Sequence, residues 1–180
     1  MKYHNIVISG DIGTGTSTLA KNLSEKLGWQ VISFGDYFRA YVKENKIDLW
    51  NKLDVPAEWE YKMDGDFHKK LENEEKLIVD GHYQGYLSKD LEDIFRILLV
   101  CDDKLSEERI LKRQHTHEET PETISKRRQG LRDSFKKLYG SADYFDPKLF
   151  HLVINTADFN EAATLEKAYQ SFVNLQKDWC

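Results

Sequence analysis

The strongest constraint on the fold is a glycine-rich turn near the N-terminus, between an apolar strand and an amphipathic helix. The apolar run is Asn5–Ser9, and the turn consists of Gly10, Asp11, Ile12, Gly13, Thr14, Gly15, Thr16, Ser17 and Thr18. In the next segment, an apolar stripe repeats with helical spacing at Leu19, Ala20, Leu23 and Leu27. Gly28 is placed to end this helix in a left-handed conformation. This order is typical of phosphate binding, and the alternative is a glycine-rich turn of another α/β protein.

The chemistry of the loop depends on its glycines and on the helix that follows. At Gly10, Gly13 and Gly15 the backbone can turn its N–H groups toward phosphate oxygens, while the helix start adds partial positive charge. Ser17 stands where a hydroxyl reaches Mg²⁺, so the loop predicts ATP and Mg²⁺ as ligands. The loop pattern has a lysine before this serine, but Thr16 takes that place here. The missing lysine weakens the positive field that phosphoryl transfer needs.

The apolar runs of the chain predict its fold class. Five runs rich in β-branched residues alternate with helical patterns, at Asn5–Ser9, Gln30–Ser33, Lys76–Asp80, Ile94–Cys101 and Leu149–Asn155. They are apolar on both faces, as in a parallel sheet that helices cover on both sides. We therefore expect an α/β three-layer sandwich with a five-stranded parallel sheet.

Composition and charge limit the kinds of partner that the protein is expected to bind. The 180 residues, 40% of them hydrophobic, suit one domain, and the net charge of -5 gives no electrostatic footprint for nucleic acid. No apolar run approaches the ~20 residues that cross a bilayer, and the N-terminus lacks a signal-peptide core. We expect a cytoplasmic protein that binds small-molecule nucleotides and neither nucleic acid nor membranes. Cys101, in a predicted buried strand, and Cys180 have no spacing for a disulfide framework or a zinc site.

Further motifs point to one family. Residues 32–39 join a strand end to a helix that carries Arg39, and residues 77–82 are an apolar run that ends in Asp80. Residues 108–113 and 123–140 are basic helical segments. Together with the glycine loop, these motifs resemble nucleoside-monophosphate kinases, especially short cytidylate kinases, over nearly the full chain.

The resemblance implies a role for each group of site residues. The acceptor-binding group is Gly35, Asp36, Arg39, Asp64, Asp66, Gly81 and His82. In this group, the resemblance gives Arg39 the acceptor phosphate. The segment that contains Asp64 and Asp66 diverges from the family, and these two carboxylates are chosen for their chemistry: they can accept the cytosine amino group, or they simply pack. The catalytic group is Asp80, Arg109, Arg113, Arg127 and Arg132. Ser17 and Asp80 would hold Mg²⁺.

The same resemblance implies the arrangement of these parts. It gives the strand order 2-3-1-4-5 in a P-loop NTPase fold, with an acceptor-binding insertion at about 36–75 and a lid at about 114–131. Residues 151–156 are similar to the final strand and to the loop that packs beside the nucleotide base.

The chain departs from the family at three cations, which leaves three functions open. Besides Thr16, Ser106 and Ser134 fall where short cytidylate kinases commonly carry arginine. A lost transition-state contact of ~2.7–4 kcal/mol slows turnover ~100- to ~1000-fold. The first function is ATP-dependent phosphorylation of a nucleoside monophosphate such as CMP or dCMP. The others are a catalytically weakened nucleotide-binding or sensing protein, and a P-loop kinase with a non-nucleotide acceptor.

Overall fold

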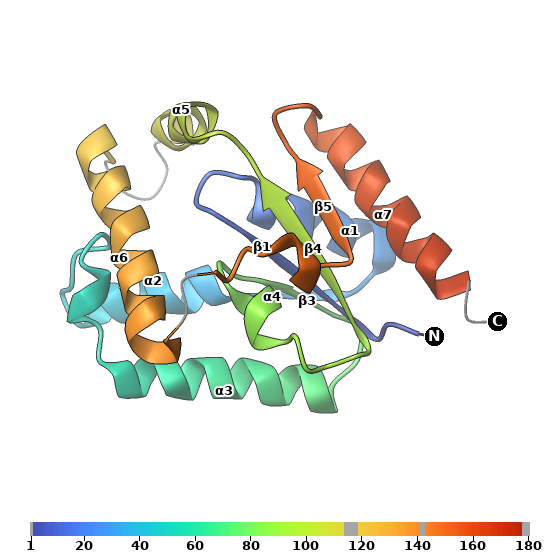
Figure 1. Cartoon of the computed structure of the whole chain (residues 1–180), viewed down its shortest axis with the longest axis horizontal. Coiled ribbons are helices and arrows are strands. Elements are labelled where there is room, and N and C mark those ends of the chain that lie inside the picture. Colours follow the sequence, from blue (N-terminus) through green and yellow to red (C-terminus); the bar gives the residue numbers. More distant parts are fainter. Residues whose placement is uncertain (1, 114–118, 141–142, 178–180) are drawn as a thin grey trace.

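A computed structural model describes residues 2–113, 119–140 and 143–177. Five parallel strands form one sheet in the order β2-β3-β1-β4-β5, with helices on both faces (Figure 1). The strands are β1 (Asn5–Gly10), β2 (Gln30–Ser33), β3 (Leu77–Asp80), β4 (Ile94–Val100) and β5 (Leu152–Asn155). This confirms the predicted fold class and the predicted strand order.

The helices fill the connections between the strands. They are α1 (Thr16–Leu27), α2 (Phe34–Glu44), α3 (Ala57–Asn73), α4 (Gln84–Leu87), α5 (Asp103–Arg113), α6 (Pro121–Tyr139) and α7 (Glu161–Lys177). Two short 3-10 helices are η1 (Lys52–Asp54) and η2 (Pro147–Leu149). Throughout the described ranges, no helix is both long and apolar enough to cross a bilayer.

The core lies on both faces of the central strand β1. Ile6 and Ile8 pack on the side of α1 and α7, whereas Val7 packs on the side of α2 and α3. All six residues of β1 are buried, so burial along this strand is continuous instead of alternating. Burial on both faces holds β1, and with it the loop that follows, in a fixed place.

Strand register brings two predicted site segments together. Ile8 of β1 and Ser33 of β2 both pair with Asp80 of β3. The carboxyl ends of these strands therefore meet beside the glycine loop, as expected for ligand sites of open parallel sheets.

Four strand ends differ from the prediction: β1 ends one residue later, at Gly10, β3 starts one residue later, at Leu77, and β5 and β4 are shorter than predicted. The last strand starts at Leu152 because residues 147–149 form η2, where Pro147 suits a helical first position and Asp146 accepts a hydrogen bond from the Lys148 N–H. β4 ends at Val100, so Cys101 lies beyond the strand and is half-buried. The prediction that Cys101 lies in a buried strand was wrong.

The predicted insertion corresponds to α2, η1 and α3, which lie between β2 and β3. Of the predicted lid, residues 114–118 lie outside the described residues. Residues 121–131 form the first part of α6, which begins with a capping box between Thr120 and Thr123.

Candidate functional site

The glycine loop has the backbone conformation that phosphate binding requires. Gly13 and Gly15 have φ angles of 81° and 98°, which side chains other than glycine rarely adopt. At Gly10 an added Cβ would lie 2.6 Å from the Leu99 carbonyl oxygen. The loop therefore approaches its neighbours too closely for larger residues, and it leads directly into the N-terminus of α1.

Asp80 and Ser17 form a hydrogen-bonded pair beside the loop. The Ser17 hydroxyl donates to Asp80 Oδ2 at 2.6 Å, and Thr16 makes a further side-chain hydrogen bond to the same carboxyl group. Asp80 is 4% exposed, and this burial raises its pKa. A hydroxyl and a carboxylate are hard oxygen ligands, which Mg²⁺ prefers when phosphates and water complete its shell. These two side chains fit the predicted metal site.

One cavity joins the loop to the predicted acceptor segment. It is lined by most of the loop and, among the other predicted residues, by Gly35, Arg39, Asp80, Gly81, His82, Arg113 and Arg127. Thr14 and Thr18 of the loop line a second cavity instead, together with Arg109 and Thr156. The first cavity therefore combines groups predicted for the donor with groups predicted for the acceptor.

Arg109 lines the second cavity and is held by hydrogen bonds to Thr156. Its guanidinium donates to Thr156 Oγ1 and to the Thr156 carbonyl oxygen, both at 2.8 Å. The Thr156 hydroxyl donates in turn to the Thr14 carbonyl oxygen at 3.0 Å. Arg109 therefore ties α5 to the loop after β5 and, through Thr156, to the glycine loop. Arg113 lines both cavities.

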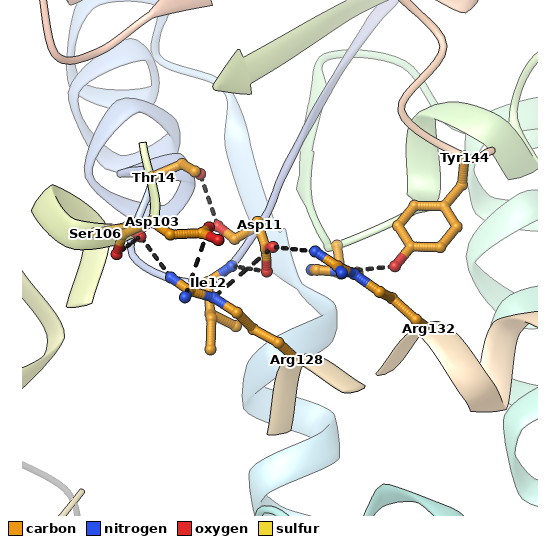
Figure 2. A network of polar contacts seen from close by, with 9 residues as sticks. Asp11, Ile12, Thr14, Asp103, Ser106, Arg128, Arg132 and Tyr144 are labelled. Carbon is orange, nitrogen blue, oxygen red and sulfur yellow. Dashed lines mark hydrogen bonds and ion pairs between the residues drawn. The ribbon is translucent and has the colours of Figure 1, made fainter. Parts of the chain in front are cut away.

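Three arginines of α6 lie near the glycine loop or line its cavity. Arg127 pairs with Glu119 at 2.8 Å and lines the first cavity. Arg128 Nε and Arg132 Nη2 are each 3.9 Å from Asp11 Oδ2 (Figure 2). Asp11 is thus an acidic residue inside a phosphate loop, held between two guanidinium groups.

Further contacts anchor these two arginines. Arg128 donates to Ser106 Oγ at 2.5 Å and lies 3.6 Å from Asp103 of α5. Arg132 bonds to the Tyr144 hydroxyl, as Figure 2 shows. The network therefore joins the loop, α5 and α6. Arg132, predicted to be catalytic, contacts Asp11 and does not line the first cavity.

Two residues predicted to bind the acceptor, Arg39 and His82, line the cavity and differ in charge. Arg39 pairs with Asp36 at 2.6 Å, one turn earlier on α2. His82 contacts the Tyr144 hydroxyl at 3.3 Å and packs against three aromatic rings. Burial lowers the pKa of His82 to about 4, so its ring is neutral at pH 7. Arg39 therefore supplies positive charge to this cavity at pH 7, and His82 does not.

Asp64 and Asp66 lie outside the first cavity. Asp64 is buried and accepts hydrogen bonds from Gln84 and from the Tyr139 hydroxyl, and its burial raises its pKa to about 6. Asp66 pairs with Lys62 at 2.6 Å on the solvent side of α3. Both carboxylates are engaged by other side chains, and their contact with a cytosine amino group stays a prediction.

Two cations of this region were not predicted as site residues from the sequence. Lys52 lines the first cavity, and Arg128 binds the loop network. Lys52 stands in a three-residue helix with no periodic pattern, so no local signal marks it. Arg128 follows Lys126 and Arg127, and helix phase is the signal that separates these adjacent cations.

Comparison with known proteins identifies relatives along most of the chain. Residues 6–130 match the AAA domain family. The cytidylate kinase of Sulfolobus acidocaldarius is 36% identical over 84% of this chain and 85% of the relative. The cytidylate kinase of Methanothrix thermoacetophila is 30% identical over 91% and 94%. An S-adenosylmethionine-dependent nucleotide dehydratase of Lacinutrix mariniflava is 30% identical over 89% of this chain but 34% of that longer protein.

Solved structures agree with the fold. A gluconokinase from Sinorhizobium meliloti 1021 has a TM-score of 0.68 at 15% identity, covering 98% of this chain and 95% of the other. A deoxyadenosine kinase from M. mycoides has a TM-score of 0.57 at 19% identity, covering 95% and 99%. At these identities the likeness shows the fold alone. The sequence relatives carry the assignment further, and they show that the chain belongs to the cytidylate kinase family of P-loop proteins.

Proposed function

We propose that this protein transfers the γ-phosphoryl group of ATP to a nucleoside monophosphate, with CMP or dCMP as the acceptor. The observation that carries the proposal is the single cavity that contains the Ser17–Asp80 pair, the glycine loop and Arg39. Family membership supports the nucleotide acceptor, because several relatives are named cytidylate kinases. The finer choice of CMP or dCMP rests on those names.

In this proposal, each group in the cavity has a task. The loop N–H groups and the start of α1 hold the donor phosphates, and Arg39 holds and orients the acceptor phosphate. An oxygen of that phosphate attacks the γ-phosphorus as the bond to ADP breaks, without a protein nucleophile. Arg113 and Arg127 neutralise charge on the transferring group. Ser17 and Asp80 would hold Mg²⁺, which would supply positive charge against the donor phosphates.

A specific observation favours a second candidate, a nucleotide-binding or sensing protein with weakened catalysis. The loop carries a carboxylate at Asp11 and no lysine at Thr16, so its own side chains repel phosphate. Arg128 and Arg132 offset this charge while they stay bound to Asp11. The two candidates differ in turnover and agree in fold and in ligand.

A coupled assay separates these candidates. Wild-type protein, ATP and Mg²⁺ are incubated with CMP, dCMP, UMP or AMP in turn, and the diphosphate product is identified by mass spectrometry. We expect CDP or dCDP to form at a higher kcat/KM than the other products. Nucleotide binding without any diphosphate product would favour the sensing protein.

Arg39→Ala is expected to raise the KM for CMP by about ten- to hundredfold while the KM for ATP changes little, because a charge-assisted contact contributes about 1.5–3 kcal/mol. Steady-state kinetics with each substrate varied in turn measure both values. The control is Lys43→Ala, because Lys43 is an exposed cation on α2, the helix that carries Arg39. Arg96→Ala would be unsuitable, because the Arg96 side chain donates to three backbone carbonyl groups. Equal changes in both KM values would place Arg39 outside the acceptor site.

Asp11→Asn is expected to tighten ATP binding about tenfold, because it removes a carboxylate from the phosphate loop and releases two guanidinium groups. Calorimetry with ATP and Mg²⁺ measures the dissociation constant. Asp103→Asn is the matched control, since Asp103 pairs with Arg128 but lies on α5. Weaker binding in Asp11→Asn alone would mean that Asp11 positions the arginines productively.

A further inference from the structure

The acceptor end of the cavity contains a buried lysine to which neither the motifs nor the relatives assign a role. Lys52 is 2% exposed, and its side chain forms part of the cavity wall beside Phe38 and Leu49. Its ammonium group lies 4.3 Å from the centre of the Phe38 ring. Lysine is almost never buried this deeply without a partner or a task. The contacts of Lys52 therefore bear on its role.

The partner of Lys52 is Glu60 of α3, which is equally buried. The ammonium group forms an ion pair with Glu60 Oε2. The Glu60 carboxylate also accepts hydrogen bonds from Ser134 Oγ at 2.9 Å and from the Tyr83 hydroxyl at 3.2 Å. Lys52 of η1, Tyr83 just before α4 and Ser134 of α6 thus all contact the same carboxylate. Glu60 is well satisfied, and it holds Lys52 in one orientation.

The ammonium group keeps unused hydrogen-bonding capacity. It has three N–H donors, and among the described residues only the Glu60 carboxylate lies within ion-pair distance of it. Within those residues Lys52 Nζ is a buried nitrogen without a hydrogen bond of regular geometry. A buried donor left in this state costs free energy, which a ligand acceptor would recover.

The charge around Lys52 disfavours a phosphate group as that ligand. Glu60 neutralises the ammonium charge, and the carboxyl group of Asp64 lies near enough to interact with Lys52. Phe38, Leu49 and Leu131 line the cavity on this side. A neutral pair beside an aromatic ring suits a planar group with carbonyl or ring-nitrogen acceptors, whereas a phosphate dianion needs net positive charge. Arg39 supplies that charge in the same cavity.

We propose that Lys52 is a specificity-determining residue that donates a hydrogen bond to the base of the nucleotide acceptor, with Glu60 as its positioning residue. This inference rests on the proposed function for the nucleotide nature of the acceptor. Lys52 reads the base, and Arg39 holds the phosphate. Lys52 therefore distinguishes a nucleoside monophosphate from a sugar phosphate that lacks the base.

The test compares the binding of CMP with that of ribose 5-phosphate, by calorimetry on the full chain without ATP. Lys52→Met alone leaves the Glu60 carboxylate buried without its cation, which is strongly destabilising. The Lys52→Met/Glu60→Gln variant removes both charges together and keeps the volume. Lys62→Met, on the exposed side of α3, is the control. Circular dichroism melts establish that each variant is folded.

We expect the double variant to bind CMP about ten- to hundredfold more weakly than wild type, with the affinity for ribose 5-phosphate unchanged. Equal losses for both ligands, or no loss for either, would overturn the role of Lys52 even if the enzyme phosphorylates CMP. A wild type that binds CMP no more tightly than ribose 5-phosphate would overturn it as well. If CMP binds through Lys52 and no transfer occurs, the inference about Lys52 stands and the proposed kinase activity fails.

Discussion

Asp80→Asn is expected to lower the rate of phosphoryl transfer by about 100- to 1000-fold, on a scale where ~1.4 kcal/mol is tenfold. Asp80 is the carboxylate that Ser17 contacts at the carboxyl edge of the sheet. An amide of the same shape removes the negative charge that would hold Mg²⁺ but still accepts the Ser17 hydrogen bond. The loss should therefore appear in turnover at saturating Mg²⁺.

Stability separates this functional role from a structural one. Burial raises the pKa of Asp80, so the charged carboxylate is costly in the folded protein, and its removal should leave the melting temperature equal or higher. Asp90→Asn is the matched control, because Asp90 is exposed and precedes β4, away from the carboxyl ends of the strands. A parallel fall in melting temperature and turnover would indicate that Asp80 supports the fold and not the metal.

The fold was predictable because its signals are local. Each strand is a short apolar run, and helix α1 carries its stripe and its terminating Gly28, which has a φ of 69°. Ser17 and Asp80 were predictable as a pair because Asp80 ends β3, Ser17 follows the loop after β1, and the carboxyl ends of these two parallel strands meet. In these cases the residue type and the position along an element determine the place in space.

The missed parts of the site depend on contacts between distant segments. Asp64 and Asp66 are two residues apart on α3, so they face different sides of the helix, and their sequence context does not indicate which side is buried. Lys52 meets Glu60 only when η1 packs against α3 and α6. Arg127 and Arg128 are adjacent and point in different directions from α6, so only the position of this helix relative to the distant glycine loop decides which of them contacts Asp11. Such choices follow from tertiary packing.

The missing cations are the clearest case in which tertiary contacts change the prediction. Arg128 donates to Ser106, and Lys52 reaches Glu60, which Ser134 also contacts. A cation therefore lies near Ser106 and near Ser134, the two serines predicted to stand where the family commonly carries arginine. Within residues 2–113, 119–140 and 143–177, no cation contacts Thr16 in a comparable way: its side chain bonds to Asp80, and it lines the cavity. Of the three predicted losses, the loop lysine at Thr16 is therefore the one without a neighbouring cation in the described part of the chain, so a lysine placed there should have a large effect.

Thr16→Lys is expected to tighten ATP binding and to raise phosphoryl transfer by about one to three orders of magnitude. The new ammonium group would extend into the cavity at the N-terminus of α1, where the backbone already favours anions. A lysine there offers a point charge to the β- and γ-phosphates. Calorimetry with ATP and Mg²⁺, and the coupled assay with CMP, dCMP and UMP, measure the two effects in one buffer.

Thr16→Met is the control, because it has similar length, loses the same contact with Asp80 and adds no charge. A gain in Thr16→Lys that Thr16→Met lacks is therefore a gain from charge. If the wild type is active and Thr16→Lys leaves it unchanged or impairs it, other cations already fill the same electrostatic role, and the new lysine meets a like charge. If the wild type is inactive and the lysine tightens ATP binding without producing CDP, dCDP or UDP, the loop was not the limiting defect. That result would favour nucleotide sensing over transfer, because a restored donor site would then lack a partner among these acceptors.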